Sequence, residues 1–264
     1  MMIRKGYFDV PVGQLHYGTA GDGGPRIVLL HESPLSNRIY FDVASQIALW
    51  GQVLLPDTPG YGQSTALTSS ATLGDYAANL IAGIKQWSGE HQVIIGGIHT
   101  GASLAVEIAN QAPELCGGLF LIGLPTYTDE MRESRIKTYA PSIELQADGS
   151  HVIWAWDRYR KMWPTAPLEH IQLAVADLYY NLERYNWAYL QAFGYRAELV
   201  IKNVKCPIMM SAAEGEFLYE GTKELAQQEG LPFHSFPGED WQGQVSLRNP
   251  DELDLALKLF AESL

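Results

Sequence analysis

Short, fully apolar runs alternate with helical patterns along most of the chain. Three of these runs cover residues 27–30, 53–55 and 93–95. Strands that are apolar on both faces are typical of a parallel sheet with helices packed on each side. Further strands are predicted at 119–122, 208–210 and 233–236, a hairpin at 6–17, and helices at 73–86 and 222–228. The sequence therefore predicts an α/β fold, with a mostly parallel central sheet and helices on both faces.

Polar side chains follow several of these predicted strands. His31, Asp57 and His99 each come shortly after an apolar run, and Glu214–Glu216 follows the run at 208–210. Parallel sheets of this kind bind ligands at the carboxyl ends of their strands. We therefore expect these side chains to lie on one rim of the sheet.

Residues 127–196 interrupt the alternation, because they have a helical pattern and no obvious strand. The stretch is dense in Trp, Tyr and Phe. We interpret it as a helical cap over the rim, inserted into a core domain formed by residues 1–126 and 197–264. Most of these rings are expected to form the cap's own core, and some to face a pocket. An exposed apolar cap serves either as a lid or as a homodimer interface, and the sequence leaves both open.

The most informative motif is Gly97-Ile98-His99-Thr100-Gly101, which lies between the apolar run at 93–95 and a helical pattern. A strand, a sharp turn flanked by glycines and a helix form the layout of a nucleophile elbow. The residue at the apex of such a turn is usually a serine, whereas here it is His99.

Composition limits the classes of partner. The chain has 264 residues, 47% of them hydrophobic, and a net charge of −12. That charge argues against nucleic acid or an anionic membrane surface as a partner. No secretory signal and no apolar run long enough for a membrane helix is visible, so we expect a cytoplasmic protein. Cys116 and Cys206 are interpreted as buried free thiols of a reducing compartment.

Together these landmarks resemble the α/β-hydrolase superfamily, in particular its cap-bearing haloalkane dehalogenases, epoxide hydrolases and C–C bond hydrolases. The segments that carry the resemblance are Leu30-His31-Glu32-Ser33-Pro34, Asp57-Thr58-Pro59-Gly60-Tyr61-Gly62-Gln63-Ser64, the elbow, Cys206 to Glu216, and Pro237-Gly238-Glu239-Asp240-Trp241. The second segment is the most specific, because it matches the family pattern D-x-P-G-x-G-x-S. The resemblance implies an α/β-hydrolase fold with a helical cap.

The resemblance also implies a catalytic set of His99, Glu216 and Asp240, with Glu239 replacing Asp240 if the register slips by one. The oxyanion and substrate-binding residues that it implies are Ser33, Thr100, His31, Glu32 and Trp241. This chain departs from the family at two positions. No Ser or Cys stands at the apex, and no histidine stands where the family has its base.

Four roles for His99 follow from these residues. A carboxylate on one ring nitrogen would make His99 a general base. An acyl-imidazole nucleophile ranks lower, since nearby carboxylates favour the charged ring. One imidazole and two carboxylates also suit a divalent metal ion. Because the sequence has no local metal-binding motif, we expect no bound metal. In the fourth case the catalytic set has decayed and the fold binds a ligand without catalysis.

We therefore expect an enzyme that acts on a small apolar or aromatic ester or carbonyl compound, with His99 as a base supported by Glu216 and Asp240. Proton abstraction by a lyase or isomerase, and a non-catalytic binding role, remain as alternatives. No dinucleotide or phosphate loop is present, so no organic cofactor is expected.

Overall fold

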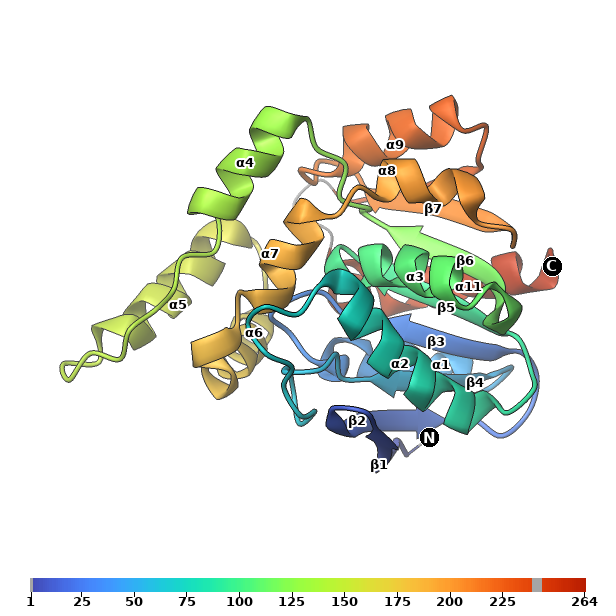
Figure 1. Ribbon diagram of the computed structural model, residues 1–264, viewed down its shortest axis with the longest axis horizontal. Coiled ribbons are helices and arrows are strands. Elements are labelled where there is room, and N and C mark those ends of the chain that lie inside the picture. The colour runs from blue at the N-terminus through green and yellow to red at the C-terminus, as the bar shows by residue number, and fades with distance from the viewer. Residues whose placement is uncertain (1, 239–243) are drawn as a thin grey trace.

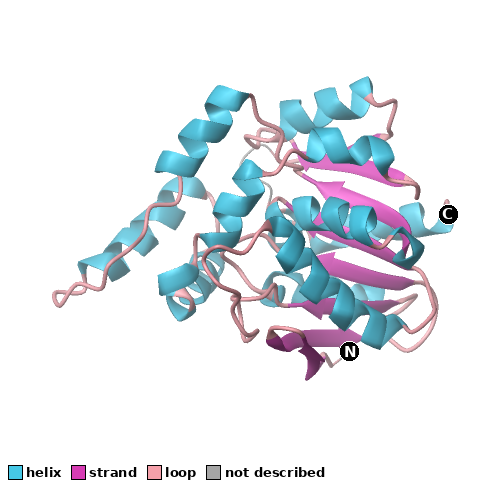
Figure 2. Ribbon diagram, in the orientation of Figure 1, coloured by secondary structure: helices cyan, strands magenta, loops and turns pink. Residues whose placement is uncertain are grey.

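The computed structural model describes residues 2–238 and 244–264, which form a twisted sheet between two layers of helices (Figure 1). Its strands are β1 (Arg4–Val10), β2 (Gly13–Ala20), β3 (Arg26–Leu30), β4 (Gln52–Pro56), β5 (Val93–Ile98), β6 (Cys116–Ile122), β7 (Ile208–Ala213) and β8 (Phe233–Phe236). Figure 2 shows these strands side by side. They form one sheet in the order β1-β2-β4-β3-β5-β6-β7-β8.

The sheet is mostly parallel, as the apolar runs predicted. Only the hairpin β1–β2 and the pair β2–β4 are antiparallel, and the remaining neighbours run in the same direction. The carboxyl ends of β3, β5, β6 and β7 therefore meet at one edge. The expected α/β-hydrolase fold is confirmed.

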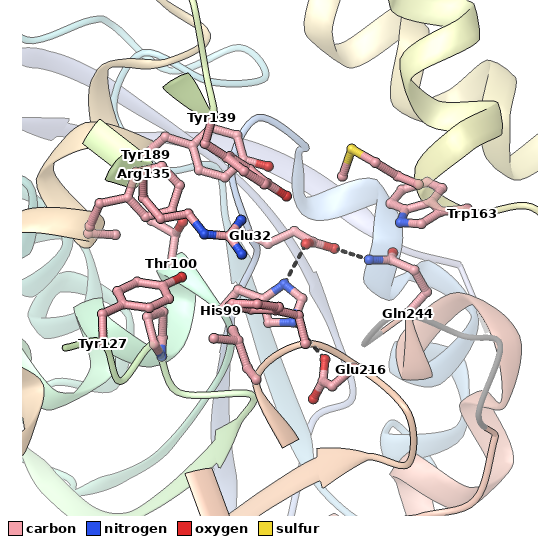
Figure 3. Close-up of a pocket in the computed structure, with 16 residues that line it drawn as sticks. Glu32, His99, Thr100, Tyr127, Arg135, Tyr139, Trp163, Tyr189, Glu216 and Gln244 are labelled. Carbon is pink, nitrogen blue, oxygen red and sulfur yellow. Dashed lines mark hydrogen bonds and ion pairs between the residues drawn. The ribbon is translucent and has the colours of Figure 1, made fainter. Parts of the chain in front are cut away.

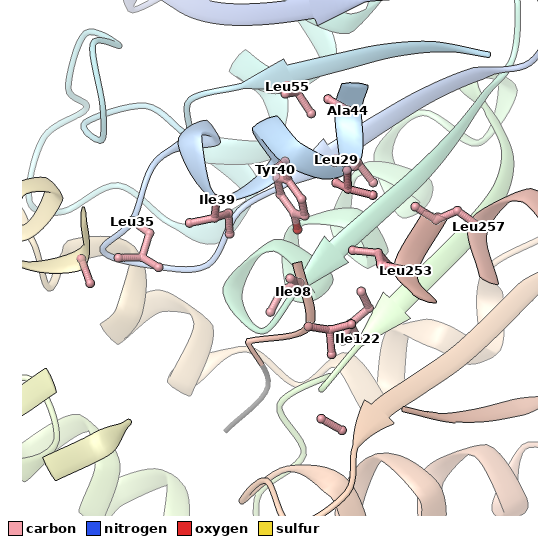
Figure 4. Packing of buried hydrophobic residues seen from close by; sticks show 14 of the residues in the cluster. Leu29, Leu35, Ile39, Tyr40, Ala44, Leu55, Ile98, Ile122, Leu253 and Leu257 are labelled. Atoms are coloured by element: carbon pink, nitrogen blue, oxygen red, sulfur yellow. The ribbon is translucent and has the colours of Figure 1, made fainter. Parts of the chain in front are cut away.

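Alternating side chains of the central strands bury both faces of the sheet. In β3, Ile27 and Leu29 belong to one hydrophobic cluster, whereas Val28 and Leu30 belong to the other. Successive strand residues point to opposite faces, so a strand that is apolar throughout needs a helical layer on each side. Figure 4 shows the first cluster, in which Leu55 lies near Ala44 of α1 and Leu29 lies towards Leu253 of α11.

Two helical layers cover these faces. Helices α2, α3, α8 and α9 lie on one side of the sheet, and α1 and α11 lie on the other (Figure 1). The core helices are α1 (Phe41–Ile47), α2 (Leu73–Ser88), α3 (Thr100–Gln111), α8 (Ala197–Val200), α9 (Tyr219–Gln228), α10 (Val245–Arg248) and α11 (Pro250–Glu262). Short 3-10 turns occur at Asn37–Tyr40, Pro113–Leu115, Leu182–Arg184 and Ile201–Asn203. Helix α2 begins where the sequence predicts, because Thr72 and Asp75 form a capping box there.

A helical insertion (residues 127–196) separates β6 from β7. It contains α4 (Asp129–Thr138), α5 (Ser150–Met162), α6 (Leu168–Tyr180) and α7 (Trp187–Gly194), which project to one side of the sheet (Figure 1). The rings differ in burial: Tyr159 and Trp163 are buried, whereas Tyr180 is exposed. That this insertion serves as a cap over the strand ends stays a prediction.

Helix α4 is fastened to the end of α7 by a buried arginine. The Arg132 guanidinium donates hydrogen bonds to the backbone carbonyls of Phe193 and Tyr195, at 2.8 and 2.6 Å, and to that of Tyr127. It also forms an ion pair with Glu198 at 3.1 Å. Carbonyl groups at the end of α7 lack intrahelical partners, so Arg132 supplies the donors that they need.

The structure also bears on the expectations for the two cysteines and for membrane-spanning helices. Both cysteines are free thiols, with Cys116 buried and Cys206 half-buried. Among the helices that the structure describes, none combines the length and the apolar character needed to cross a membrane.

The close contact between α3 and β3 generates the first prediction. A Cβ atom on Gly101 would lie 2.0 Å from the backbone oxygen of Leu30, so Gly101→Ala has to push the helix off the strand. We expect a loss of about 3 kcal/mol or more in the free energy of unfolding, measured by urea denaturation. Gly23→Ala is the control, because its new Cβ would meet no atom within 4 Å. Equal stability of the two variants would contradict this account of the contact.

Candidate active site

His99 occupies a strained turn between β5 and α3. Its backbone has φ 50° and ψ −107°, and it is the only non-glycine residue with positive φ within residues 2–238 and 244–264. Such a conformation costs about 1–3 kcal/mol and persists only where the surroundings enforce it. The His99 N–H donates to the Ile122 carbonyl at 2.9 Å, and the Ser103 N–H donates to the His99 carbonyl at 3.1 Å. The turn is tight enough that a Cβ on Gly97 would lie 2.3 Å from the Gly101 backbone.

The His99 ring lies between two glutamates (Figure 3). Nδ1 is 2.8 Å from Glu32 Oε2, and Nε2 is 2.9 Å from Glu216 Oε2. The remaining oxygen of each carboxylate also accepts a hydrogen bond, from Gln244 Nε2 at 2.7 Å for Glu32 and from the Ala213 N–H at 3.1 Å for Glu216. We call Glu32, His99 and Glu216 the carboxylate–imidazole row.

The row holds His99 in its charged form. Ionised carboxylates only accept hydrogen bonds, so both bonds form when both ring nitrogens carry a proton. Burial by itself lowers the pKa of His99, but Glu32 and Glu216 together outweigh burial and raise that pKa well above the usual value for histidine. The side chains are largely shielded from water, with exposed fractions of 19% for His99, 8% for Glu32 and 2% for Glu216. The row then carries two negative charges and one positive charge.

Gly123 packs against this row, and sequence analysis did not select it. It follows β6 directly, has φ 57°, and its N–H donates to the Ser211 carbonyl at 2.8 Å. A Cβ at this position would lie 2.7 Å from His99 Cδ2 and 2.9 Å from Glu216 Oε1. The sequence could have pointed to Gly123, because it is a glycine directly after a buried strand, at the edge of the sheet where ligands bind.

A cavity of about 140 Å³ lies above the row. The residues that line it from the sheet side are Glu32, His99, Thr100, Pro125, Glu216, Phe217, Leu218 and Gln244. Those that line it on the other side are Tyr127, Arg135, Tyr139, Met162, Trp163, Tyr189, Ala192 and Phe193, all from the helical insertion. The cavity is therefore polar and charged where the strands end and mainly aromatic on the opposite side (Figure 3).

The structure brings some of the expected site residues together and not others. Thr100, at the start of α3, lines the cavity beside His99. Ser33 is buried next to Glu32 and is absent from the cavity lining among the described residues. The expected Asp240, its alternative Glu239, and Trp241 all lie outside the described residues. Glu32, expected to bind substrate, bonds directly to His99.

His31 fastens two loops to each other and does not line the cavity. Its Nε2 accepts a hydrogen bond from the Thr58 N–H at 2.9 Å, and its Nδ1 lies 2.9 Å from the Glu32 carbonyl. Since a backbone N–H has to donate, Nδ1 carries the ring proton. The described residues include no group of three or more His, Cys, Asp or Glu side chains suited to hold a metal ion.

Comparison with curated proteins finds relatives that match part of the chain. A 2-hydroxy-6-oxononadienedioate/2-hydroxy-6-oxononatrienedioate hydrolase from Pseudomonas putida is 30% identical over 125 residues, which cover 46% of this chain and 43% of that protein. A haloalkane dehalogenase from Mesorhizobium japonicum is 29% identical over 105 residues, or 40% and 34% of the two chains. The matches thus span less than half the length of these relatives. No family model matches the chain.

Solved structures resemble the chain over almost its whole length. An E-2-(acetamidomethylene)succinate hydrolase superposes with a TM-score of 0.81 at 17% identity, covering 99% of this chain and 100% of that one. An epoxide hydrolase from Vigna radiata has the same TM-score at 15% identity, covering 99% of both chains. Likeness at this identity establishes the fold and says nothing of the substrate.

The sheet order, the sharp turn after β5 and the site at the strand ends define an α/β-hydrolase fold. The chain therefore has the fold of the α/β hydrolases, and part of its sequence is also similar to the two curated proteins named above. Within the elbow it carries His99 in place of the usual nucleophile.

The raised pKa of His99 leads to a prediction on Glu216→Gln. That substitution removes one of the two carboxylates, so the pKa of His99 should fall in the variant, as followed by nuclear magnetic resonance of the labelled ring. Glu214→Gln is the matched control, because Glu214 is exposed and lies only two residues away. An unchanged His99 titration in Glu216→Gln would contradict the proposed charge state.

The same substitution has a defined effect on stability. A histidine with a raised folded-state pKa contributes stability in full below its unfolded pKa of about 6.5, and the contribution is lost as pH rises through the folded-state pKa. Because the unfolded-state pKa is the same in both chains, the stability advantage of the wild type over Glu216→Gln should shrink as pH rises from the folded-state pKa of His99 in the variant to that in the wild type, by about 1.4 kcal/mol for each unit between these two pKa values. Urea denaturation at several pH values measures this decline.

Proposed function

We propose that this protein is a hydrolase that acts on the ester or carbonyl group of a small, partly aromatic compound. In this proposal the carboxylate–imidazole row is the proton-transfer unit. The observation that carries it is the placement of His99 at the elbow, hydrogen-bonded to two carboxylates at the floor of an aromatic-lined cavity.

The row favours a carboxylate as the base, in place of the expected base role of His99 itself, and it also argues against nucleophilic attack by His99. A nucleophilic imidazole needs a neutral ring with one free nitrogen, whereas both nitrogens of His99 are bonded to carboxylates. The raised pKa of His99 further reduces the neutral form at physiological pH. Covalent catalysis through His99 would have to break one of these bonds and remove a proton first.

The proton of the attacking water enters the row at a carboxylate oxygen. Glu32 is the better entry point, because its side chain is 8% exposed and that of Glu216 is 2% exposed. The carboxylate takes one proton from water while the water oxygen bonds to the carbonyl carbon. When the bond between that carbon and the leaving group breaks, Glu32 passes the proton on to the leaving group, so that no net proton is gained or lost and His99 keeps both of its ring protons. Glu216 keeps the ring oriented and charged throughout.

The start of α3 supports the developing negative charge on the carbonyl oxygen. Thr100 is the first residue of that helix, so its N–H has no acceptor within the helix. It lies beside His99 on the cavity wall, where an N–H donor stabilises an oxyanion. Ser33, next to Glu32, is proposed as the source of the second N–H.

The helical insertion supplies the binding surface for the substrate, and we propose that it acts as the cap. Tyr127, Tyr189 and Phe193 line the cavity, and Trp163 closes one side of it. A volume of about 140 Å³ is similar to that of cavities that hold a single benzene-sized ring. The substrate is therefore proposed to be compact and to place an apolar group among these rings.

A lyase or isomerase is the second candidate function. The row has no Ser or Cys nucleophile, and a carboxylate beside an imidazolium is also suited to remove a proton from carbon. Exchange of substrate hydrogen for deuterium in heavy water, without hydrolysis, would favour this candidate.

The proposed role of the row predicts the behaviour of two variants. His99→Gln and Glu32→Gln should lower the hydrolysis of small aryl esters and lactones by about 100-fold or more, because each removes a member of the proton-transfer unit. Glu214→Gln should retain activity, since its side chain is exposed and outside the cavity lining. Initial rates measured in a buffer with chelator provide the comparison. Full activity of His99→Gln would refute the proposal.

The pH dependence of the wild type gives a separate test. If catalysis requires the charged imidazolium within the row, kcat should fall as pH rises through the raised pKa of His99. A free neutral histidine acting as base would instead give a rate that increases through pH of about 6.5. A rate profile from pH 5 to 10 distinguishes these two slopes.

A further inference from the structure

Arg135 presents a charged group to the cavity, and no residue within 2–238 or 244–264 serves as its anionic partner. Its side chain forms no hydrogen bond or ion pair with any residue that the structure describes. Its guanidinium instead stacks on aromatic rings, at 4.0 Å from the Phe217 centroid, 4.5 Å from that of Tyr139 and 5.9 Å from that of Tyr127. Figure 3 shows the side chain extending from α4 towards Glu32 and His99.

Three other arginines that lie near the core domain or the insertion have acceptors. Arg38 pairs with Asp177, Arg132 with Glu198, and Arg184 donates to the Gly60 carbonyl. An arginine has five N–H donors in a rigid fork that fits a carboxylate. The flat faces of the Arg135 guanidinium are covered by rings, so its orientation is fixed while its donors stay available.

The position of Arg135 matters because the rest of the site is negatively charged. The carboxylate–imidazole row carries a net charge of about −1 when His99 is protonated. A negatively charged ligand would be repelled from such a cavity unless a cation balanced the row. Arg135, on the opposite wall of the same cavity, is the residue that supplies this charge.

We propose that Arg135 anchors a carboxylate of the substrate, so that the enzyme acts on compounds that carry both a carboxylate and the reacting ester or carbonyl group. The carboxylate binds the guanidinium fork at the α4 side, and the reacting group lies over His99. The apolar part between them packs against Tyr189 and Phe193. This inference rests on the proposed function for the reacting group but not for the binding of the anion.

Binding of a simple anion tests the anchor without requiring catalysis. Benzoate is compared with benzamide, which has a similar shape and no charge, by titration calorimetry on the full chain. We expect benzoate to bind more tightly than benzamide to the wild type. Arg135→Gln should weaken benzoate binding by about 10- to 100-fold and leave benzamide binding unchanged, because only the charged hydrogen bonds are lost. Arg135→Lys keeps the positive charge but lacks the forked donors of arginine. Its affinity for benzoate should therefore lie between those of the wild type and Arg135→Gln.

The control is Lys137→Gln, which removes one positive charge from the same helix. Lys137 is 71% exposed and pairs with Glu133 on the outer surface of α4. Its loss should leave benzoate affinity unchanged, which separates a local anchor from the effect of net charge. Thermal unfolding of every variant reports whether α4 remains in place.

Three results would overturn the anchor. The first is equal affinity of the wild type for benzoate and benzamide. The second is a loss of both ligands to the same extent in a folded Arg135→Gln variant, which would assign Arg135 to the shape of the cavity alone. The third is equal benzoate binding by the wild type and Arg135→Gln.

Turnover of monomethyl and dimethyl phthalate separates this inference from the proposed function. If the anchor is correct, the wild type favours the charged half-ester in kcat/KM, and Arg135→Gln loses this preference mainly through KM. Benzoate binding that depends on Arg135, without hydrolysis of either ester, would support the anchor and count against ester hydrolysis. Hydrolysis of both esters that is insensitive to Arg135→Gln would support the proposed function and reject the anchor.

Discussion

The positive charge of His99, held between two buried carboxylates, is the interaction on which the site depends. Two carboxylates as shielded as Glu32 and Glu216 repel each other and lose hydration, so they require a cation between them. The imidazolium meets this requirement only if each nitrogen faces one carboxylate. The strained backbone at the elbow holds the ring in this orientation, and the two hydrogen bonds offset the strain.

The parallel sheet brings these groups together from distant parts of the sequence. Glu32 follows β3, His99 follows β5 and Glu216 follows β7, and these strands lie close together in the sheet. The row therefore runs across the strand ends. Strand β6, which lies between β5 and β7, is followed directly by Gly123, where only a residue without a side chain leaves room for the ring and the carboxylate. The glycine is as much a part of the site as the charged residues.

Much of the fold was predictable because it is encoded in local patterns. Apolar runs that are buried on both sides gave the parallel strands, and the glycines around His99 gave the elbow. The resemblance of the segment from Cys206 to Glu216 to the α/β-hydrolase pattern implied Glu216, whose contact with His99 the structure shows. These signals are properties of consecutive residues.

The remaining site residues depend on side-chain directions that consecutive residues do not encode. The Glu32 side chain was assigned to substrate, since its sequence neighbours say nothing of the ring 67 positions away that it contacts. Gln244 and Arg135 were not selected at all, because a glutamine before a short helix and an arginine on a polar helix have no distinguishing pattern. Their importance comes from contacts across the cavity, which form only once the insertion is packed on the core.

The bond network of Arg132 has a consequence for how the cavity is used. Its guanidinium ties α4 to the end of α7, so the wall that carries Arg135 and the wall that carries Phe193 are coupled. Separating the two helices would leave the buried Arg132 guanidinium without its carbonyl acceptors, which is energetically costly. The two helices should accordingly move as a rigid body. Selectivity in such a site arises from preorganisation, with the entropy of ordering the binding surface paid during folding and not on each encounter with a ligand.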